Sequence, residues 1–240
     1  MSGSGNMGKI NENLLSVKER IQKACEKSGR NPEDITLLAV TKTVSAERIQ
    51  EIMDLGVTSL GENRVQELLS KYDELPGATW HIIGHLQTNK VKSIIGKADM
   101  IQSVDSVRLA NEIAKRSLEK GIVTDVLCEI NIGKEENKGG VMPEETEEFA
   151  HQLLETEGIR LRGFMTMAPF GCTKDEYKKY FSKTYNIYLD ILGKTSHNII
   201  EPILSMGMSD SFEAAIEEGA TLVRVGSSIF GSRFYPEKEH

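Results

Sequence analysis

The sequence predicts an α/β protein folded as a single (β/α)8 TIM barrel, with an extra helix before its first strand. The chain has 240 residues, close to the roughly 250 residues of one such barrel. Short apolar runs alternate with helical patterns, and eight such repeats indicate a parallel sheet covered by helices. No linker, charge block or low-complexity tract divides residues 9–240, so one domain is expected there. A doubly wound open sheet is the alternative arrangement of the same units.

The N-terminal segment lies outside this repeat. Residues 1–8 read MSGSGNMG and are expected to form a flexible leader or a cloning remnant. A helix is expected from Ile10 to Ser28, and Gly29 supplies its stop signal. The apolar residues that recur at helical spacing are Ile10, Leu14, Val17, Ile21 and Ala24.

Each strand candidate is a short apolar or β-branched run, and each is followed by a helical pattern. The strand candidates are Ile35–Val40, Val57–Leu60, Thr79–Ile83, Met100–Val104, Asp125–Ile132, Ile159–Met165, Pro202–Ser205 and Thr221–Val225. The helix candidates are Ser45–Leu55, Asn63–Tyr72, Gln87–Ile95, Ser106–Lys120, Pro143–Glu157, Lys174–Leu192, Ser209–Glu218 and a short helix from Ser227. The first strand is apolar on both faces, as expected in a parallel sheet.

Composition and charge argue against several classes of protein. Hydrophobic residues make up 39% and charged residues 27% of the chain, as in an ordinary globular domain. The net charge of −7 argues against a general affinity for nucleic acid or for an anionic membrane. No apolar run approaches the roughly 20 residues of a membrane span, and no signal peptide is visible. Cys25, Cys128 and Cys172 have no metal-like spacing, which favours reduced thiols in a cytoplasmic protein.

Lys42 directly follows the first strand candidate. The carboxyl ends of the strands form the site of a (β/α)8 barrel, so this lysine is a site candidate. Partial desolvation there favours the neutral amine, which can act as a nucleophile or form a Schiff base. A solvated lysine at a strand end is the alternative that this residue alone leaves open.

Small and hydroxyl residues gather after the seventh and eighth strand candidates. They are Ser205, Gly207, Ser209, Gly226, Ser227 and Ser228. The loops at these two positions often bind phosphate in such barrels, through backbone N–H groups at the start of a helix. A single serine at such a place is more often a helix N-cap. Two clusters at the two phosphate-favoured loops nevertheless favour a phosphate cup.

Two histidines lie near the end of the third strand candidate. His81 and His85 would be about 13 Å apart on an extended chain, too far to share a metal ion. We interpret His81 as a core or pairing histidine and keep His85, at the strand end, as a site candidate. The sequence predicts no metal site.

Several longer motifs occur along the chain. They are Ala39–Lys42 (AVTK), Gly61–Glu67 (GENRVQE), Trp80–Gln87 (WHIIGHLQ), Gly163–Met167 (GFMTM), Ser205–Ser209 (SMGMS) and Arg224–Gly226 (RVG). Together they resemble the pyridoxal phosphate homeostasis proteins (the YggS/PROSC type), which look like the barrel domain of alanine racemase standing alone. The resemblance runs from about Ile10 to Arg233, and the motifs at 61–67 and 80–87 are the most specific. It implies a fold-type III barrel that lacks the C-terminal β domain of alanine racemase.

This resemblance implies roles for individual residues. Lys42 would hold pyridoxal 5′-phosphate (PLP) covalently as an internal aldimine. Arg224 would point its guanidinium at the pyridine nitrogen, Asn63 would contact the ring substituents, and His85 and Met206 would line the pocket. The phosphate would lie in the cup of Ser205, Gly207, Ser209, Gly226 and Ser227. Lys138, in the loop 133–140, matches a lysine proposed in this family for secondary cofactor handling, with a solvated loop lysine as the alternative.

An arginine at the pyridine nitrogen limits the chemistry of the cofactor. Guanidinium does not give up its proton, so the ring nitrogen stays unprotonated and the ring is a weaker electron sink. Racemisation also needs a base on each face of the substrate, and in alanine racemase the second base is a tyrosine from the partner's C-terminal domain. Here no tyrosine follows a strand candidate. Tyr72, Tyr177, Tyr180, Tyr185 and Tyr188 fall on predicted helices, and Tyr235 falls in the tail.

The leading hypothesis is a cytoplasmic PLP-binding protein that stores, buffers and delivers the cofactor without strong catalysis. Apo forms of PLP-dependent enzymes are its expected recipients, a monomer is the expected state, and no nucleic-acid or membrane partner is expected. A PLP enzyme of low activity, such as an amino-acid racemase, is the second hypothesis. The third is a barrel enzyme without PLP that acts on a phosphorylated metabolite and uses Lys42 as an aldolase-type amine.

Overall fold

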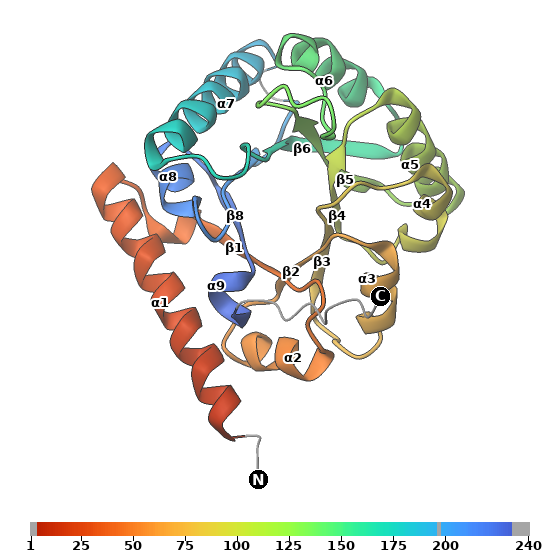
Figure 1. The fold of residues 1–240 in the computed structure, drawn as a ribbon. Coiled ribbons are helices and arrows are strands. Elements are labelled where there is room, and N and C mark those ends of the chain that lie inside the picture. Colours follow the sequence, from red (N-terminus) through yellow and green to blue (C-terminus); the bar gives the residue numbers. More distant parts are fainter. Residues whose placement is uncertain (1–3, 196–197, 232–240) are drawn as a thin grey trace, which may run out of the picture.

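Eight parallel strands close into a barrel in which each strand pairs with the next and β8 pairs with β1. The computed structural model describes residues 4–195 and 198–231. The strands are β1 (Thr36–Val40), β2 (Ser59–Glu62), β3 (Thr79–Ile82), β4 (Met100–Val104), β5 (Thr124–Ile130), β6 (Ile159–Thr166), β7 (Ile203–Ser205) and β8 (Leu222–Val225). Figure 1 shows the helices arranged in a ring around the closed sheet. The predicted (β/α)8 barrel is therefore confirmed, and the open-sheet alternative is wrong.

A helix follows every strand, as predicted. These helices are α2 (Ala46–Asp54), α3 (Val65–Lys71), α4 (Thr88–Ile94), α5 (Val107–Glu119), α6 (Thr146–Glu155), α7 (Lys174–Lys194), α8 (Phe212–Glu217) and α9 (Ser227–Phe230). Two 3-10 helices, η1 (Pro32–Asp34) and η2 (Pro143–Glu145), precede β1 and α6. The helix expected from Ser209 begins instead at Phe212, because hydrogen bonds between Met208 and Ser211 close a turn before it. Within residues 4–195 and 198–231, no helix is long and apolar enough to cross a membrane.

The extra helix, α1 (Ser4–Ser28), packs outside the ring against α2, α8 and α9 (Figure 1). Its predicted apolar stripe is buried: Ile10, Leu14, Val17, Ile21 and Ala24. The helix begins at Ser4, inside the stretch 1–8 that composition predicts to be a flexible leader. Propagation favours this extension, because each residue added to an existing helix gains a backbone hydrogen bond without a new nucleation cost. Residues 1–3 lie outside the described part of the chain.

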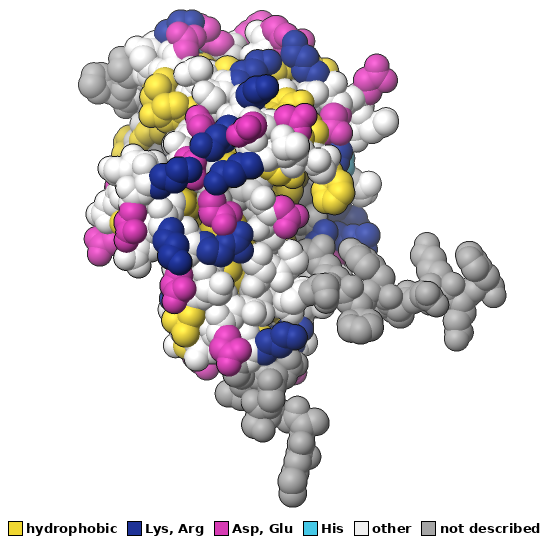
Figure 2. Space-filling model, turned by 60° about the vertical axis from the view of Figure 1, so that its left-hand side comes forward, with side chains coloured by type: hydrophobic (Ala, Val, Ile, Leu, Met, Phe, Trp, Pro, Cys, Tyr) yellow, Lys and Arg dark blue, Asp and Glu magenta, His cyan; other side chains and the backbone are white. Residues whose placement is uncertain are grey.

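Ion pairs also tie α1 to the barrel. Glu217 of α8 pairs with Lys27 of α1 and with Lys174 and Lys178 of α7. Figure 2 shows the side of the molecule that carries α1, where Lys and Arg side chains are interspersed with Asp and Glu. The three ion pairs of Glu217 therefore join α1 and α7 to α8.

Apolar residues lie on both sides of the barrel wall. The main core fills the space between the sheet and the helices, and Trp80 and Phe164 are among its largest fully buried side chains. Inside the barrel, small clusters form around Leu38 and around Leu127. Side chains alternate between the two faces of a strand. A residue two or four positions after a member of an inner cluster, on the same strand, therefore also faces the barrel interior. Near the carboxyl ends of the strands, many of these residues are polar.

Candidate functional site

Lys42 lies in the turn that follows β1, at the carboxyl end of the barrel. β1 ends at Val40, and Lys42 is half-buried. The next residue, Thr43, has a φ of +63°. This left-handed conformation is uncommon for a β-branched residue, so the turn after Lys42 is conformationally constrained. The structure thus places Lys42 at the end of the first strand, where the site of such a barrel forms.

A chain of polar side chains crosses the barrel interior from β8 to β3. Arg224 Nη1 donates a hydrogen bond to Ser205 Oγ at 2.6 Å, and Nη2 donates to the main-chain oxygen of Thr166 at 2.8 Å. Ser205 Oγ donates to Gln102 Oε1 at 2.7 Å. Gln102 Nε2 lies 2.9 Å from His81 Nδ1, which then accepts the hydrogen bond. Because these side chains are buried, the network fixes the direction of the Arg224 guanidinium.

Arg224 is a buried cation that forms no ion pair within residues 4–195 and 198–231. Its exposed fraction is 2%. Burial lowers the pKa of Arg224 to about 10, and the negative charge of Glu129 acts in the opposite direction. The guanidinium therefore stays charged at neutral pH. A buried charge without a close partner is costly, so a ligand that accepts a hydrogen bond from it would be stabilised.

His81 is a buried core residue, in agreement with the interpretation from sequence. Its exposed fraction is 6%. Burial lowers the pKa of His81 to about 4, against the raising effect of Asp125. The imidazole is therefore neutral at pH 7, which fits its role as the acceptor at the end of the Arg224 network.

Carboxyl groups lie at the mouth of the barrel on β5 and after β4. Glu129 is 4% exposed, and burial followed by the charge of Asp105 raises the pKa of Glu129 to about 7, while Arg224 lowers it. Both carboxylates approach Gly139, where a Cβ would lie 3.2 Å from Asp105 Oδ2 and 3.4 Å from Glu129 Oε2. His85, with a side chain 70% exposed, has its Nδ1 3.9 Å from Asp105 Oδ2. His85 is thus at the rim, beside an acidic pair.

Sequence reasoning missed Glu129 and Gln102, because each lies inside a run that was interpreted as one apolar strand. A signal was present in both runs. Glu129 is in phase with Leu127 along β5, and Gln102 is in phase with Met100 along β4. Polar residues in the inward phase near a strand's carboxyl end are the ones that face a barrel site.

The small residues after β7 and β8 come together around Ser209. Ser209 Oγ accepts hydrogen bonds from the backbone N–H groups of Gly226 and Ser228, both at 3.3 Å. Ser227 is exposed and is the first residue of α9. Gly207 has a φ of +90°, and a Cβ there would lie 2.5 Å from the Cβ of Ala215. The close approach of this loop to α8 therefore requires glycine at position 207.

The extra helix α1 supports this loop from outside. Arg20 Nε donates to Glu213 Oε1 at 2.7 Å, and Arg20 Nη2 donates to the main-chain oxygen of Ser209 at 3.3 Å. The guanidinium also lies over the ring of Phe212, 4.4 Å from its centre. Arg20 thus joins α1 to the turn that carries Ser209.

Several residues that the sequence predicts to be in the site take no part in the hydrogen bonds around Ser209. Ser205 is the last residue of β7, and its hydroxyl contacts Arg224 and Gln102 instead of the loop around Ser209. Met206 is fully buried in the main core between sheet and helices, away from the expected pocket lining, because the chain at the end of β7 turns this side chain outward. Lys138 is exposed in the loop after β5.

Asn63 lies half-buried between β2 and α3, close to the loop that follows β3. A Cβ at Gly84 would lie 2.6 Å from the main-chain oxygen of Asn63. The two loops therefore pack directly on each other, and glycine at position 84 permits it. His85 directly follows Gly84. The contact therefore brings Asn63 and His85 to neighbouring positions at the barrel mouth.

Comparison with known proteins gives one consistent family. Residues 12–234 match the family model described as "Alanine racemase, N-terminal domain". A pyridoxal phosphate homeostasis protein of Aquifex aeolicus is 46% identical over 226 residues, covering 93% of this chain and 98% of the relative. The protein of the same name from Escherichia coli K12 is 39% identical, covering 97% of this chain and 100% of the relative. PipY of Synechococcus elongatus, solved with PLP bound, superposes with a TM-score of 0.80 at 32% identity, covering 92% of this chain and 100% of PipY.

Proposed function

Because the chain belongs to the pyridoxal phosphate homeostasis proteins of the alanine racemase N-terminal domain family, we propose that it binds PLP through an imine on Lys42. In this proposal the protein takes part in cofactor homeostasis, holding and delivering PLP without strong catalysis. One observation carries it. The lysine after β1, the buried Arg224 and the amides around Ser209 all lie at the carboxyl end of one barrel.

The described residues fit the chemical needs of PLP. The aldehyde needs an amine, the ring nitrogen needs a hydrogen-bond donor, and the phosphate needs a cradle of N–H groups. Lys42 would supply the amine and Arg224 the donor. The N–H groups of Gly226 and Ser228 already converge on one oxygen, Ser209 Oγ. A phosphate oxygen accepts the same kind of hydrogen bond. Ser227, which lies between these two residues, is exposed to solvent.

The role proposed for Arg224 favours holding over strong catalysis. When bound, PLP supplies an aldehyde that exchanges between amines and a ring that accepts electrons. Arg224 keeps its proton at neutral pH, so it would donate a hydrogen bond to the ring nitrogen without protonating it. Ser205 and Thr166 hold the guanidinium in a fixed direction. We propose Ser205 as a support for Arg224 more than as a direct phosphate contact.

The position of the tyrosines also favours carriage over racemisation. Tyr177, Tyr180, Tyr185 and Tyr188 lie on α7, and Tyr72 lies at the end of α3. Tyr235 lies outside the described residues. Within the part of the chain that the structure describes, no tyrosine therefore follows a strand in the way a second racemase base would. The recipients in this proposal are apo forms of PLP-dependent enzymes.

The test is a pair of measurements on the purified protein. PLP is added while the visible absorption of an imine is followed, for the wild type and for Lys42→Ala. The loaded protein is then mixed with an apo form of a PLP-dependent enzyme, and the recovery of that enzyme's activity is followed. We expect an imine band that Lys42→Ala lacks, and recovery of the apo enzyme. Robust racemisation of an amino acid, seen as deuterium exchange at its Cα that depends on Lys42, would contradict the carrier assignment. Protein that ignores added PLP would contradict the cofactor assignment.

A further inference from the structure

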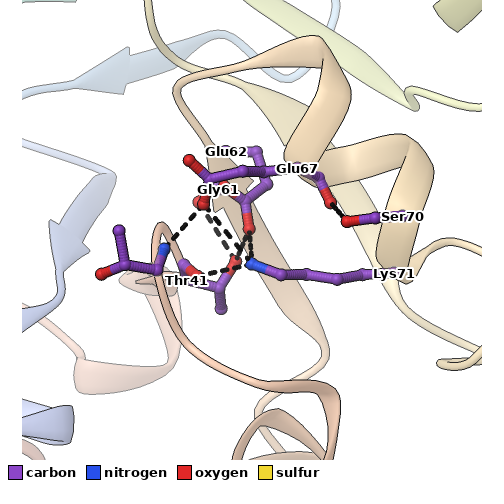
Figure 3. A network of polar contacts seen from close by, with 7 residues as sticks. Thr41, Gly61, Glu62, Glu67, Ser70 and Lys71 are labelled. Carbon is purple, nitrogen blue, oxygen red and sulfur yellow. Dashed lines mark hydrogen bonds and ion pairs between the residues drawn. The ribbon is translucent and has the colours of Figure 1, made fainter.

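The turn that carries Lys42 is held on both sides by one helix. α3 begins directly behind this turn, and two of its residues, Glu67 and Lys71, lie one helical turn apart on the same face. Figure 3 shows both side chains extending from α3 toward the chain around Thr41. Their contacts fall on the main chain immediately before and immediately after Lys42.

Lys71 holds the residue that precedes Lys42. Its Nζ donates to the main-chain oxygen of Thr41 at 2.8 Å and to Glu62 Oε1 at 2.7 Å. The same Glu62 oxygen accepts from Thr41 Oγ1 at 2.6 Å. Thr41 is therefore tied to β2 through its side chain and to α3 through its carbonyl (Figure 3).

Glu67 holds the residue that follows Lys42. Its Oε2 accepts a hydrogen bond from the backbone N–H of Thr43 at 2.6 Å. Thr43 has the positive φ that β-branched residues rarely adopt. Such a conformation persists only where the surroundings impose it, and it tends to occur at functional sites. The Glu67 carboxylate provides one such constraint, since it binds the N–H of this residue.

The burial of these charges argues for a geometric role. Glu62 is fully buried, and the Lys71 side chain is 10% exposed. Glu62 Oε2 has no hydrogen-bond partner among residues 4–195 and 198–231. Burial raises the pKa of Glu62, while the hydrogen bonds from Lys71 and Thr41 lower it. A buried ion pair is often no more stabilising than a well-packed apolar pair. Stability alone therefore does not explain a lysine and a carboxylate at this place.

We infer that Glu67 and Lys71 are positioning residues for Lys42, fixing the main chain on both sides of it so that its amine is aimed into the barrel mouth. The inference rests on the proposed function, in which the Lys42 amine adds to the PLP aldehyde and water leaves as the imine forms. A misplacement of about 1 Å can slow such a reaction by roughly a hundredfold. Loss of either contact should therefore slow imine formation even though neither residue touches the cofactor.

The sharpest test compares Glu67→Ala with Glu67→Gln. Both variants remove the negative charge, but the glutamine oxygen can still accept the Thr43 N–H. The rate of imine formation with PLP is measured in each variant, together with hydrogen exchange of the Thr43 amide in the ligand-free protein. We expect Glu67→Ala to form the imine about tenfold or more slowly and to exchange the Thr43 amide faster. Glu67→Gln should stay near the wild type in both measurements.

The Lys71 contact is tested without leaving an unpaired buried charge. The double variant Glu62→Leu/Lys71→Met removes the lysine and its carboxylate partner together, and it should also form the imine more slowly. Lys120→Met is the matched control, because Lys120 also donates to a main-chain oxygen, that of Ile95, at the other end of the barrel. An imine that forms at the wild-type rate in Glu67→Ala and in the double variant would overturn the inference. A wild type that forms no imine on Lys42 would instead overturn the proposed function.

Discussion

Lys71 Nζ lies 2.8 Å from the main-chain oxygen of Thr41, the residue immediately before Lys42. One ammonium on α3 thus joins the end of β1 to the end of β2, where it also pairs with Glu62. The contact uses a buried charge to hold the carbonyl of a residue in the turn after β1. Contacts on the outer face of the sheet, at the ends of β1 and β2, therefore support the turn that carries Lys42 at the barrel mouth.

Removing Lys71 alone should be costly to folding. In Lys71→Met, Glu62 would remain buried without its partner, and the loss of such a partner typically costs about 3–5 kcal/mol. The double variant Glu62→Leu/Lys71→Met should regain most of this loss, because no charge is left inside. Urea unfolding of the two variants measures the difference. As a control, Lys194→Met removes an exposed pair with Asp190 and Glu147 and should change the unfolding free energy little. Equal losses in the single and double variants would contradict this account of the pair.

The raised pKa of Glu129, about 7 against 4.5 for an ordinary glutamate, predicts a pH-dependent stability. Between these pH values the unfolded chain has lost the proton and the folded chain has kept it, so the folded state becomes less stable as pH rises. Above pH 7 the cost is complete, at roughly 3 kcal/mol or less. Glu129→Gln lacks this cost. The difference in unfolding free energy, Glu129→Gln minus wild type, should therefore be larger at pH 8 than at pH 5.

Urea unfolding at both pH values checks this prediction. Glu136→Gln makes the same substitution in the exposed loop after β5 and is the matched control. If Glu129→Gln differs from the wild type by the same amount at pH 5 and at pH 8, the carboxyl does not titrate in the way described here.

The proposed phosphate cup predicts a selective effect of charge at position 227. Ser227 is exposed beside the amides that converge on Ser209. In Ser227→Glu, a carboxylate would repel the phosphate dianion of PLP, and its affinity should fall about tenfold or more. Pyridoxal, which has no phosphate, should bind to Ser227→Glu as it binds to the wild type. Ser227→Gln has the same size without the charge and should bind PLP almost normally. The assignment of the cup fails if PLP and pyridoxal lose affinity equally in Ser227→Glu.

The fold was predictable because local signals and the global arrangement agree. Each strand is a short apolar run, and each helix carries a stripe at helical spacing, so the barrel follows from their alternation. Boundaries were less certain. The loop after β5 turns back, with the N–H of Asn131 bonded to the oxygen of Val141, and β5 therefore ends at Ile130 instead of Ile132.

The candidate site was only partly predictable. Lys42 and the serines after β7 and β8 could be found because the barrel puts strand ends in one place. Glu67 and Lys71 could not be found, because charges four residues apart on a helix normally form a solvated face. Only the packing of α3 against β2 brings them to the turn of Lys42. Gln102 and Glu129 were missed for a different reason: each lies in a run interpreted as one apolar strand, although both are polar residues in its inward phase.

The most direct test of the central claim is to locate the bond between the protein and PLP. The purified protein is loaded with PLP, reduced with borohydride, digested and mapped by peptide mass spectrometry. The account predicts loss of the visible band on reduction and one dominant pyridoxyl adduct, on Lys42. It also predicts that Lys42→Ala folds normally and carries no such adduct there. An adduct chiefly on another lysine, such as Lys138, or no adduct at all, would contradict the assignment of Lys42 as the cofactor-binding amine.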